Sequence, residues 1–229
     1  KLLQAAGRMR RHTIVETLRQ ENPPVEDLLQ KFTEQREDGD LDAAAAFSSE
    51  LVRRDPSREN YERLAEVLRQ TDQGVELVEV REKMLQKFGP DRELRRELID
   101  AACDYGFPDR VEEMWLEYCT AHPGDGTILK TMIYALRRDE HQRRACRLLT
   151  RLAENITQKA HKADVLAYRA DSRRRLGERE KALDSYREAI RIEPEARSKA
   201  RRLHEAAEIL DDLGREEEAH AARKKALAL

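Results

Sequence analysis

The feature that most constrains this chain is a helical pattern that returns about every 34 residues. In the clearest copy, residues 163–194, apolar or small side chains recur in steps of three, four or six on both sides of Gly177, and Pro194 ends the pattern. This spacing predicts two short amphipathic helices joined by a glycine turn. Equivalent turns are predicted at Gly7, Gly39, Gln73, Gly106, Glu140, Gly177 and Gly214. Successive turns are separated by 32, 34, 33, 34, 37 and 37 residues.

Composition supports helices and excludes several other classes. Charged residues and apolar residues each make up 39% of the 229 residues, aromatic residues make up 5%, and there are 9 glycines. Chains rich in Ala, Leu, Glu, Arg and Lys form long amphipathic helices, whereas sandwiches, barrels and Gly-rich nucleotide-binding folds need more aromatic residues or glycines. No apolar run approaches the 18 or so residues that cross a bilayer, which excludes an integral membrane protein.

A helix–turn–helix unit of this length resembles the tetratricopeptide repeat. The resemblance covers nearly the whole chain and implies an all-α fold, an α-solenoid in which antiparallel hairpins stack into a right-handed superhelix. It assigns residues 1–24 to a partial repeat, the second helix of a truncated hairpin. It assigns about six further repeats to residues 25–58, 59–91, 92–125, 126–159, 163–196 and 200–229. Half-repeat helical arrays of RNA-processing scaffolds are a second family, suggested by the stretch 111–123.

Three further details of the sequence lead to expectations. The last two turn separations hold three extra residues each, around residues 158–162 and 195–199, which predicts either longer loops or extended helices there. The chain begins without Met in an already helical pattern, so we expect a fragment of a longer protein. We expect neighbouring helices to approach each other closely where the sequence has small residues. These residues are Ala44, Ala170, Ala182, Ala207 and Ala219.

Core packing is also the better interpretation of two residue types that could be functional. Trp115 shares a helical spacing with Val111 and Cys119, which favours the core over an interface. Cys103, Cys119 and Cys146 are odd in number and form no C-x-x-C pair, which predicts buried reduced thiols. Unpaired cysteines favour the cytoplasm, and the compartment is otherwise open.

No catalytic chemistry is predicted. The common phosphate-loop, dinucleotide, nucleophile-elbow and zinc-protease motifs do not occur, and the six histidines lack the spacing of metal ligands. We therefore expect no catalytic residues, no metal and no cofactor, and a protein that is not an enzyme.

The resemblance implies a concave groove lined by the first helix of each hairpin. The residues expected to point into it are Asn60, Arg63, Arg96, Asp100, Lys130, Tyr134, Arg137, Arg138, Asp171, Arg174 and Arg175. The final repeat contributes Glu208, Asp211 and Asp212, so the expected groove is basic in its centre and acidic toward its C-terminal end. Such a surface suits an acidic peptide segment or a free C-terminal carboxylate. The competing interpretation is an ordinary solvated face with i,i+4 partners.

Two functions from different classes remain. The first is a non-catalytic scaffold that binds a peptide or partner subunit in the groove. The second is an RNA-associated array with an arginine stripe at Arg137, Arg138, Arg143, Arg144, Arg147 and 173–175. A net charge of -2 disfavours nucleic acid, and so does the presence of Tyr134 as the only evident groove aromatic. No membrane partner is expected, and self-association through a terminal repeat is compatible with either function.

Overall fold

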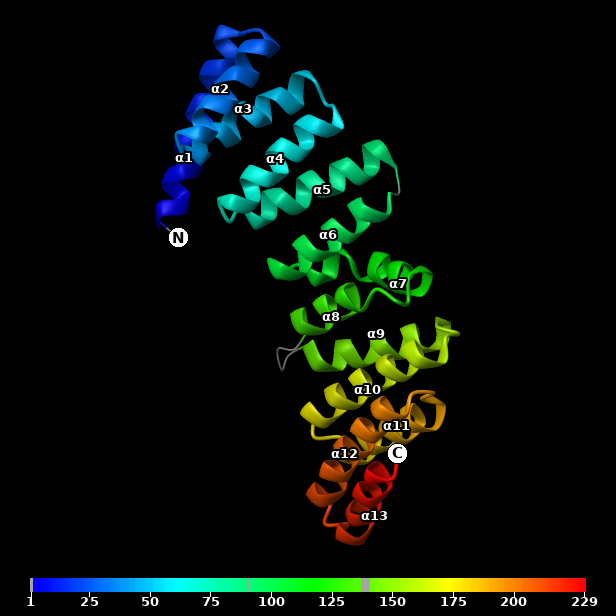
Figure 1. Cartoon of the computed structure of the whole chain (residues 1–229). Helices are drawn as coiled ribbons and strands as arrows, with labels where there is room; N and C mark the ends of the chain where they lie inside the picture. The colour runs from blue at the N-terminus through cyan, green and yellow to red at the C-terminus, as the bar shows by residue number, and fades with distance from the viewer. Residues whose placement is uncertain (1, 90, 137–140) are drawn as a thin grey trace. The chain divides into compact units, whose positions relative to one another are not determined.

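The computed structural model describes residues 2–89, 91–136 and 141–229, and within these ranges it contains α-helices, one short 3-10 helix and no strand (Figure 1). None of the helices described has both the length and the apolar character needed to cross a bilayer. The chain divides into two compact units, an N-terminal unit Lys1–Tyr105 and a C-terminal unit Gly106–Leu229. The all-α prediction is confirmed.

The N-terminal unit is a sequential stack of helices. From α2 onward each helix packs against the next, and α1 packs on α3. Its helices are α1 (Leu2–Glu21), α2 (Val25–Glu37), α3 (Leu41–Arg54), α4 (Arg58–Gln70), α5 (Gly74–Phe88) and α6 (Arg92–Asp104).

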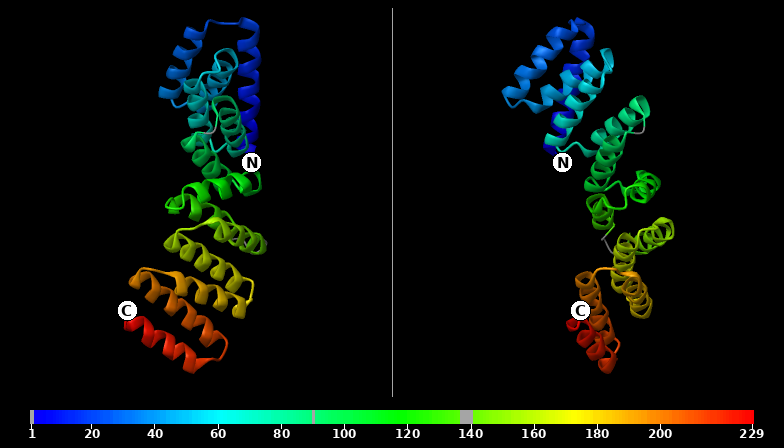
Figure 2. Two further views of the ribbon diagram at one scale, coloured as in Figure 1. Left: turned by 90° about the vertical axis from the view of Figure 1, so that its right-hand side faces the viewer. Right: turned by 45° about the vertical axis from the view of Figure 1, so that its right-hand side comes forward.

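In the C-terminal unit α9 to α13 also pack each against the next, whereas α7 packs on both α8 and α9, and Figure 2 shows α10 to α13 running back and forth side by side. Its elements are η1 (Pro108–Arg110), α7 (Glu112–Ala121), α8 (Gly126–Ala135), α9 (Gln142–Asn155), α10 (Lys159–Arg175), α11 (Arg179–Ile192), α12 (Ala196–Asp212) and α13 (Glu216–Leu227). We call the even-numbered helices α2 to α12 first helices and the odd-numbered helices α3 to α13 second helices. Each unit is therefore a solenoid of stacked helices.

Four of the turns between first and second helices share one hydrogen-bond pattern. After α10, the Gly177 N–H donates to Arg174 O at 3.0 Å and the Glu178 N–H donates to Arg173 O at 3.0 Å. This pair of bonds defines a Schellman C-cap, whose central residue adopts the left-handed conformation. The same two bonds close the turns centred on Gly39, Asp72 and Gly214, all at positive φ. The recurrent turn is the backbone expression of the sequence repeat.

Two of the predicted turn positions are wrong in detail, and a third lies outside the described residues. Gly7 is inside α1 rather than at a turn; its Cα faces Asp42, because a Cβ there would lie 2.7 Å from the nearest carboxylate oxygen. In the third predicted turn the left-handed residue is Asp72, with φ 55°, and not Gln73. The turn predicted at Glu140 falls in 137–140, outside the described residues.

Gly74 serves close packing rather than backbone conformation. It begins α5 beneath the Tyr105 ring, and a Cβ on it would lie 2.1 Å from two ring carbons. We expect Gly74→Ala to lower the free energy of unfolding by about 1–3 kcal/mol, because the ring or α5 must shift. Urea unfolding followed by circular dichroism at 222 nm measures this. Gly126→Ala is the matched control, since a Cβ at this other helix start meets nothing within 4 Å. Equal stability of Gly74→Ala and the unsubstituted chain would contradict the expectation.

Small residues and Trp115 lie in the core, as predicted. Ala44, Ala170, Ala182, Ala207 and Ala219 are all fully buried, the last four within one apolar cluster of α10 to α13. Trp115 is also fully buried, and its indole Nε1–H donates to Ile128 O at 3.0 Å.

The three cysteines are free thiols. Cys103 and Cys119 are buried as predicted, but Cys146 is half-buried on α9. Burial raises the pKa of the Cys103 thiol to about 12, with Asp100 and Asp104 adding to the shift. Cys103 is therefore a protonated, packed side chain at neutral pH.

The extra residues of the last two repeats extend helices rather than loops. The first helices α10 and α12 each have 17 residues, whereas α2, α4 and α6 each have 13. Both begin at the extra residues, at Lys159 and Ala196. Of the two predicted alternatives, the structure shows the extended helices.

Candidate partner-binding surface

The first helices of the C-terminal unit present polar and aromatic side chains at helical spacing. Residues three or four apart on one helix share a face. On α8, α10 and α12 these are the residues that we call the first-helix face: Lys130, Tyr134, Tyr168, Asp171, Arg175, Glu205, Glu208 and Asp212.

An aromatic pair occupies this face. Tyr134 on α8 is 54% exposed, and among the described aromatic residues it alone is exposed. Tyr168 on α10 is half-buried, and its phenol has a raised pKa, first because of burial and then because of nearby Asp164 and Tyr134. Sequence reasoning missed Tyr168, although it lies three residues before the predicted Asp171 and so on the same side of the helix. The face thus offers two neighbouring phenol rings.

Asp171 accepts a hydrogen bond from a buried tyrosine. The Tyr186 hydroxyl donates to Asp171 Oδ1 at 2.6 Å, and burial is the main cause of the raised pKa of Tyr186. Glu205 on α12 lies near both groups, and its pKa is raised first by burial and then by the charge of Asp171. Asp171 therefore ties α10 to α11 as well as lining the face.

Arg174 is paired with the next first helix. Its guanidinium donates to Glu208 at 2.9 Å and approaches Asp212 at 3.5 Å. Glu208 and Asp212 were predicted as part of the acidic end of the groove, and here they neutralise one arginine of its predicted basic centre. Lys130 and Arg175 are exposed and form no ion pair with another described residue.

The four groove residues predicted in the N-terminal unit lie on α4 and α6, where Asn60, Arg63 and Arg96 contact residues near in the sequence. Asn60 is 3% exposed; its amide donates to Asp55 O at 2.9 Å and its Oδ1 accepts from Arg63 at 2.6 Å. Arg63 also pairs with Glu59. Arg96 pairs with Glu93 at 3.4 Å, and Asp100 is half-buried on the same helix. Asn60 is thus a structural residue at the start of α4.

Two predicted groove residues, Arg137 and Arg138, lie outside the described residues. The other nine divide between the units, four in the N-terminal unit and five in the C-terminal unit. A single groove through all eleven stays a prediction.

The predicted arginine stripe is partly used within the protein. Arg144 pairs with Asp109 and Glu112, and Arg173 donates to Lys181 O at 3.1 Å and to Ser185 Oγ at 2.7 Å. Arg143 and Arg147 are exposed on α9, the second helix of its pair.

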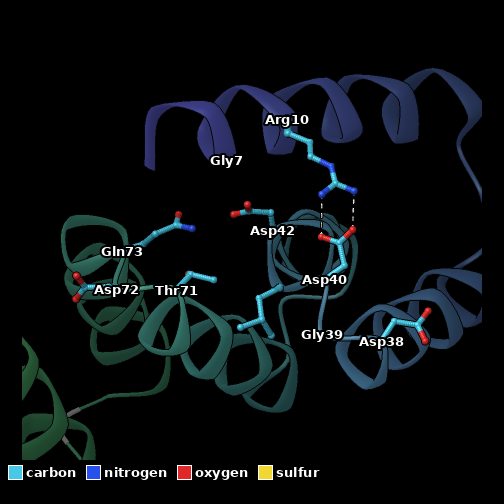
Figure 3. A pocket seen from close by; sticks show the side chains of 10 residues that line it. Gly7, Arg10, Asp38, Gly39, Asp40, Asp42, Thr71, Asp72 and Gln73 are labelled. Atoms are coloured by element: carbon cyan, nitrogen blue, oxygen red, sulfur yellow. Dashed lines mark hydrogen bonds and ion pairs between the residues drawn. The ribbon is translucent and has the colours of Figure 1, made fainter. Parts of the chain in front are cut away.

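A hollow of about 600 Å3 in the N-terminal unit is acidic, and Figure 3 shows it between α1 and two interhelical turns. Arg10 reaches down from α1 to Asp40, at 3.2 Å from Oδ1. Asp40 also caps α3 by accepting from the Ala43 N–H at 3.2 Å. Asp42 points toward Gly7. Asp40 therefore joins α1 to the start of α3 beside this hollow. Among the described residues, no group of three or more His, Cys, Asp or Glu side chains is arranged to hold a metal ion.

No protein-family model and no curated protein matches the sequence. Solved structures of similar form include MamA, at 20% identity and a TM-score of 0.45, covering 73% of this chain and 93% of that chain. YrrB, described as a TPR protein with an unusual peptide-binding site, has 17% identity and a TM-score of 0.44, covering 80% of this chain and 93% of that chain. A tetratricopeptide repeat protein from Parabacteroides merdae has 14% identity and a TM-score of 0.41, covering 89% of this chain and 92% of that chain.

The architecture of this chain is identified by its own turns and packing. Four turns share one Schellman pattern, each joins a first helix to a second helix, and α2 to α6 and α9 to α13 stack in chain order. The chain is a tetratricopeptide-like helical-repeat protein.

Proposed function

We propose that this chain is a non-catalytic scaffold that binds a peptide or a partner subunit on the first-helix face. The observation that carries the proposal is the exposure of Tyr134, 54%, beside the half-buried Tyr168 on the neighbouring first helix. Tyrosine is enriched at protein interfaces, because its ring offers a large contact area with little loss of side-chain entropy and its hydroxyl can hydrogen-bond.

Charge on this face favours an acidic segment only modestly. Lys130 and Arg175 are the exposed cations without an ion pair to a described residue, whereas Arg174 is held by Glu208 and Asp212. The preferred peptide therefore carries one apolar or aromatic anchor for the tyrosines and one or two carboxylates for the cations.

Peptide selection on the intact chain tests the proposal. A random 12-residue peptide library is selected on the chain, and selected peptides are measured by fluorescence anisotropy. Tyr134→Ala is expected to weaken binding by about tenfold or more, as loss of a central aromatic anchor does. Lys130→Glu/Arg175→Glu is expected to weaken the binding of acidic peptides and to leave the binding of uncharged peptides unchanged.

Arg143→Glu/Arg147→Glu is the matched control, because it makes the same change of charge on α9. It is expected to leave peptide binding unchanged. Peptides that bind all variants equally would overturn the first-helix face as the site.

The same control variant tests the RNA alternative, which the exposure of Arg143 and Arg147 favours. A 20-nucleotide oligouridine is the probe. If RNA is the ligand, its affinity falls steeply between about 50 and 200 mM salt and is lost in Arg143→Glu/Arg147→Glu. Under the scaffold proposal the chain binds peptides, and oligouridine binds weakly in all variants.

A further inference from the structure

A second hollow lies in the C-terminal unit, away from the first-helix face. It is a groove of about 620 Å3 between the second helices α11 and α13, and α12 forms its floor. The floor is apolar and consists of Leu203, Ala206 and Leu210 of α12. On the α11 side the groove is lined by Leu183 and Ile190, which are also apolar. Ala221 and Ala222 of α13 are short, and this leaves the groove open on that side.

The groove and the first-helix face lie on opposite sides of α12. Each residue of an α-helix turns by about 100°. The groove uses positions 199, 203, 206 and 210, and the first-helix face uses positions 205, 208 and 212. The two sets have the same spacing and are offset by two residues, or about 200°. A ligand in the groove therefore does not touch Tyr134 or Tyr168.

The rim of the groove is cationic. Arg187, Arg191, Lys199 and Lys225 line it, with Glu218 as the single acidic side chain. Glu218 is already shared, at 3.5 Å from Arg187 and 2.7 Å from Arg215. Arg191, Lys199 and Lys225 form no ion pair with another described residue. Three cations beside an apolar floor are thus left without a counter-charge from the described chain.

The N-terminal unit contains a groove at the equivalent place, and a helix of this chain reaches it. This groove of about 400 Å3 lies between second helices α3 and α5, over α4. Its charged lining residues include Glu76 and Glu79 of α5 as well as Arg53 and Lys83. Arg11 of another helix, α1, enters there; it donates to the Gln73 side chain and lies 3.3 Å from Glu76. A helix of this chain therefore supplies a side chain of opposite charge to Glu76 in a groove of this kind.

We propose that the groove between α11 and α13 is a docking site for an acidic amphipathic helix of a partner protein. Apolar side chains one turn apart on that helix enter over Leu203 and Leu210, and its flanking carboxylates reach Arg191, Lys199 and Lys225. The charge of the rim favours an acidic helix, just as Glu76 in the other groove pairs with Arg11 of α1.

A designed peptide pair tests the proposal on the intact chain. The probe is an 18-residue peptide, capped at both ends, with leucines at alternating steps of three and four and glutamates beside them. Its twin has lysine in place of every glutamate. We expect the glutamate peptide to bind and the lysine twin to bind at least about tenfold more weakly in fluorescence anisotropy.

Charge reversal then locates the site. Arg191→Glu/Lys225→Glu is expected to lower the affinity for the glutamate peptide by about tenfold or more and to raise the affinity for the lysine twin. Arg179→Glu/Arg197→Glu makes the same change of charge at exposed positions of α11 and α12 outside the groove, and is expected to change neither affinity by more than about twofold. Ala222→Trp fills the groove and keeps its charges, and is expected to abolish binding while Tyr134→Ala leaves it unchanged.

Several results would overturn the proposal. Equal binding of the two peptides would remove the electrostatic argument, and equal effects of the two charge reversals would place the peptide elsewhere. Binding of phosphatidylglycerol vesicles without binding of the glutamate peptide would identify a lipid surface instead. Loss of peptide binding in Tyr134→Ala would assign the peptide to the first-helix face, and the groove would then have no ligand of its own.

Discussion

Replacing Arg202 with methionine is expected to lower the free energy of unfolding of the C-terminal unit by about 3–5 kcal/mol. Arg202 on α12 is fully buried and donates to Asp164 of α10 at 2.6 Å. It also pairs with Glu193 at the end of α11, which is 5% exposed. One guanidinium therefore joins three helices. Without it, the carboxylate of Glu193 stays buried with no cation, and a buried unpaired charge is costly.

Two further variants isolate that cause. Arg202→Met/Glu193→Met removes both buried charges, and it is expected to recover most of the lost stability, since apolar replacements of a buried ion pair are often neutral or better. Arg201→Met is the neighbouring control: Arg201 is 64% exposed and lies 3.9 Å from Glu205, so a change of about 0.5 kcal/mol or less is expected. Urea unfolding by circular dichroism measures all three. A double variant as unstable as the single one would show that packing, rather than charge, is lost.

Trp115→Ala is expected to cost a similar amount, about 3–5 kcal/mol, by leaving a cavity between α7 and α8. The indole is fully buried and bonded to Ile128 O, so both its contacts and its hydrogen bond are lost. Trp115→Phe keeps a buried ring, and the expected cost falls to about 1 kcal/mol, the value of one hydrogen bond.

Hydrogen exchange measured by mass spectrometry is the suitable readout, because Trp115 is the only tryptophan and fluorescence disappears with it. In a helical-repeat protein each hairpin is stabilised mainly by its neighbours, so the loss is local. Amides of α7 to α9 are expected to exchange about a hundred-fold or more faster, while those of α2 to α4 keep their rates. Uniform acceleration along the whole chain would contradict local stabilisation.

Most of the fold was predictable from the sequence, because hydrophobic spacing and turn residues act locally. The helix pairs, the buried alanines and the buried tryptophan follow from those patterns. The exceptions have tertiary causes. Gly74 lies one place after the turn predicted at Gln73, and its small size is required by the Tyr105 ring, which lies 31 positions further along the sequence. Gly7 matched the repeat spacing, but its contact with Asp42 belongs to helix packing.

The charged surface was less predictable, because its partners are one repeat apart rather than one turn apart. Arg174 donates to Glu208, 34 residues later, and Arg58 donates to Asp91, 33 residues later. Arg151 donates to Glu113, 38 residues earlier. Sequence reasoning paired charges only within a helix, at i,i+4. In a stack of hairpins, equivalent positions of neighbouring repeats are also adjacent, and these pairings determine which cations stay available to a partner.

The four Schellman turns also bear on how such repeats diverge. Gly39, Gly177 and Gly214 occupy the left-handed position with nothing within 4 Å of an added Cβ, and Asp72 occupies the equivalent position in the remaining turn. The requirement there is on φ alone, which glycine meets best and Asp or Asn can meet. In the genetic code two of the four glycine codons become aspartate codons by a single base change. A repeat can therefore lose its most recognisable sequence mark in one mutation and still keep its turn, as the turn at Asp72 does.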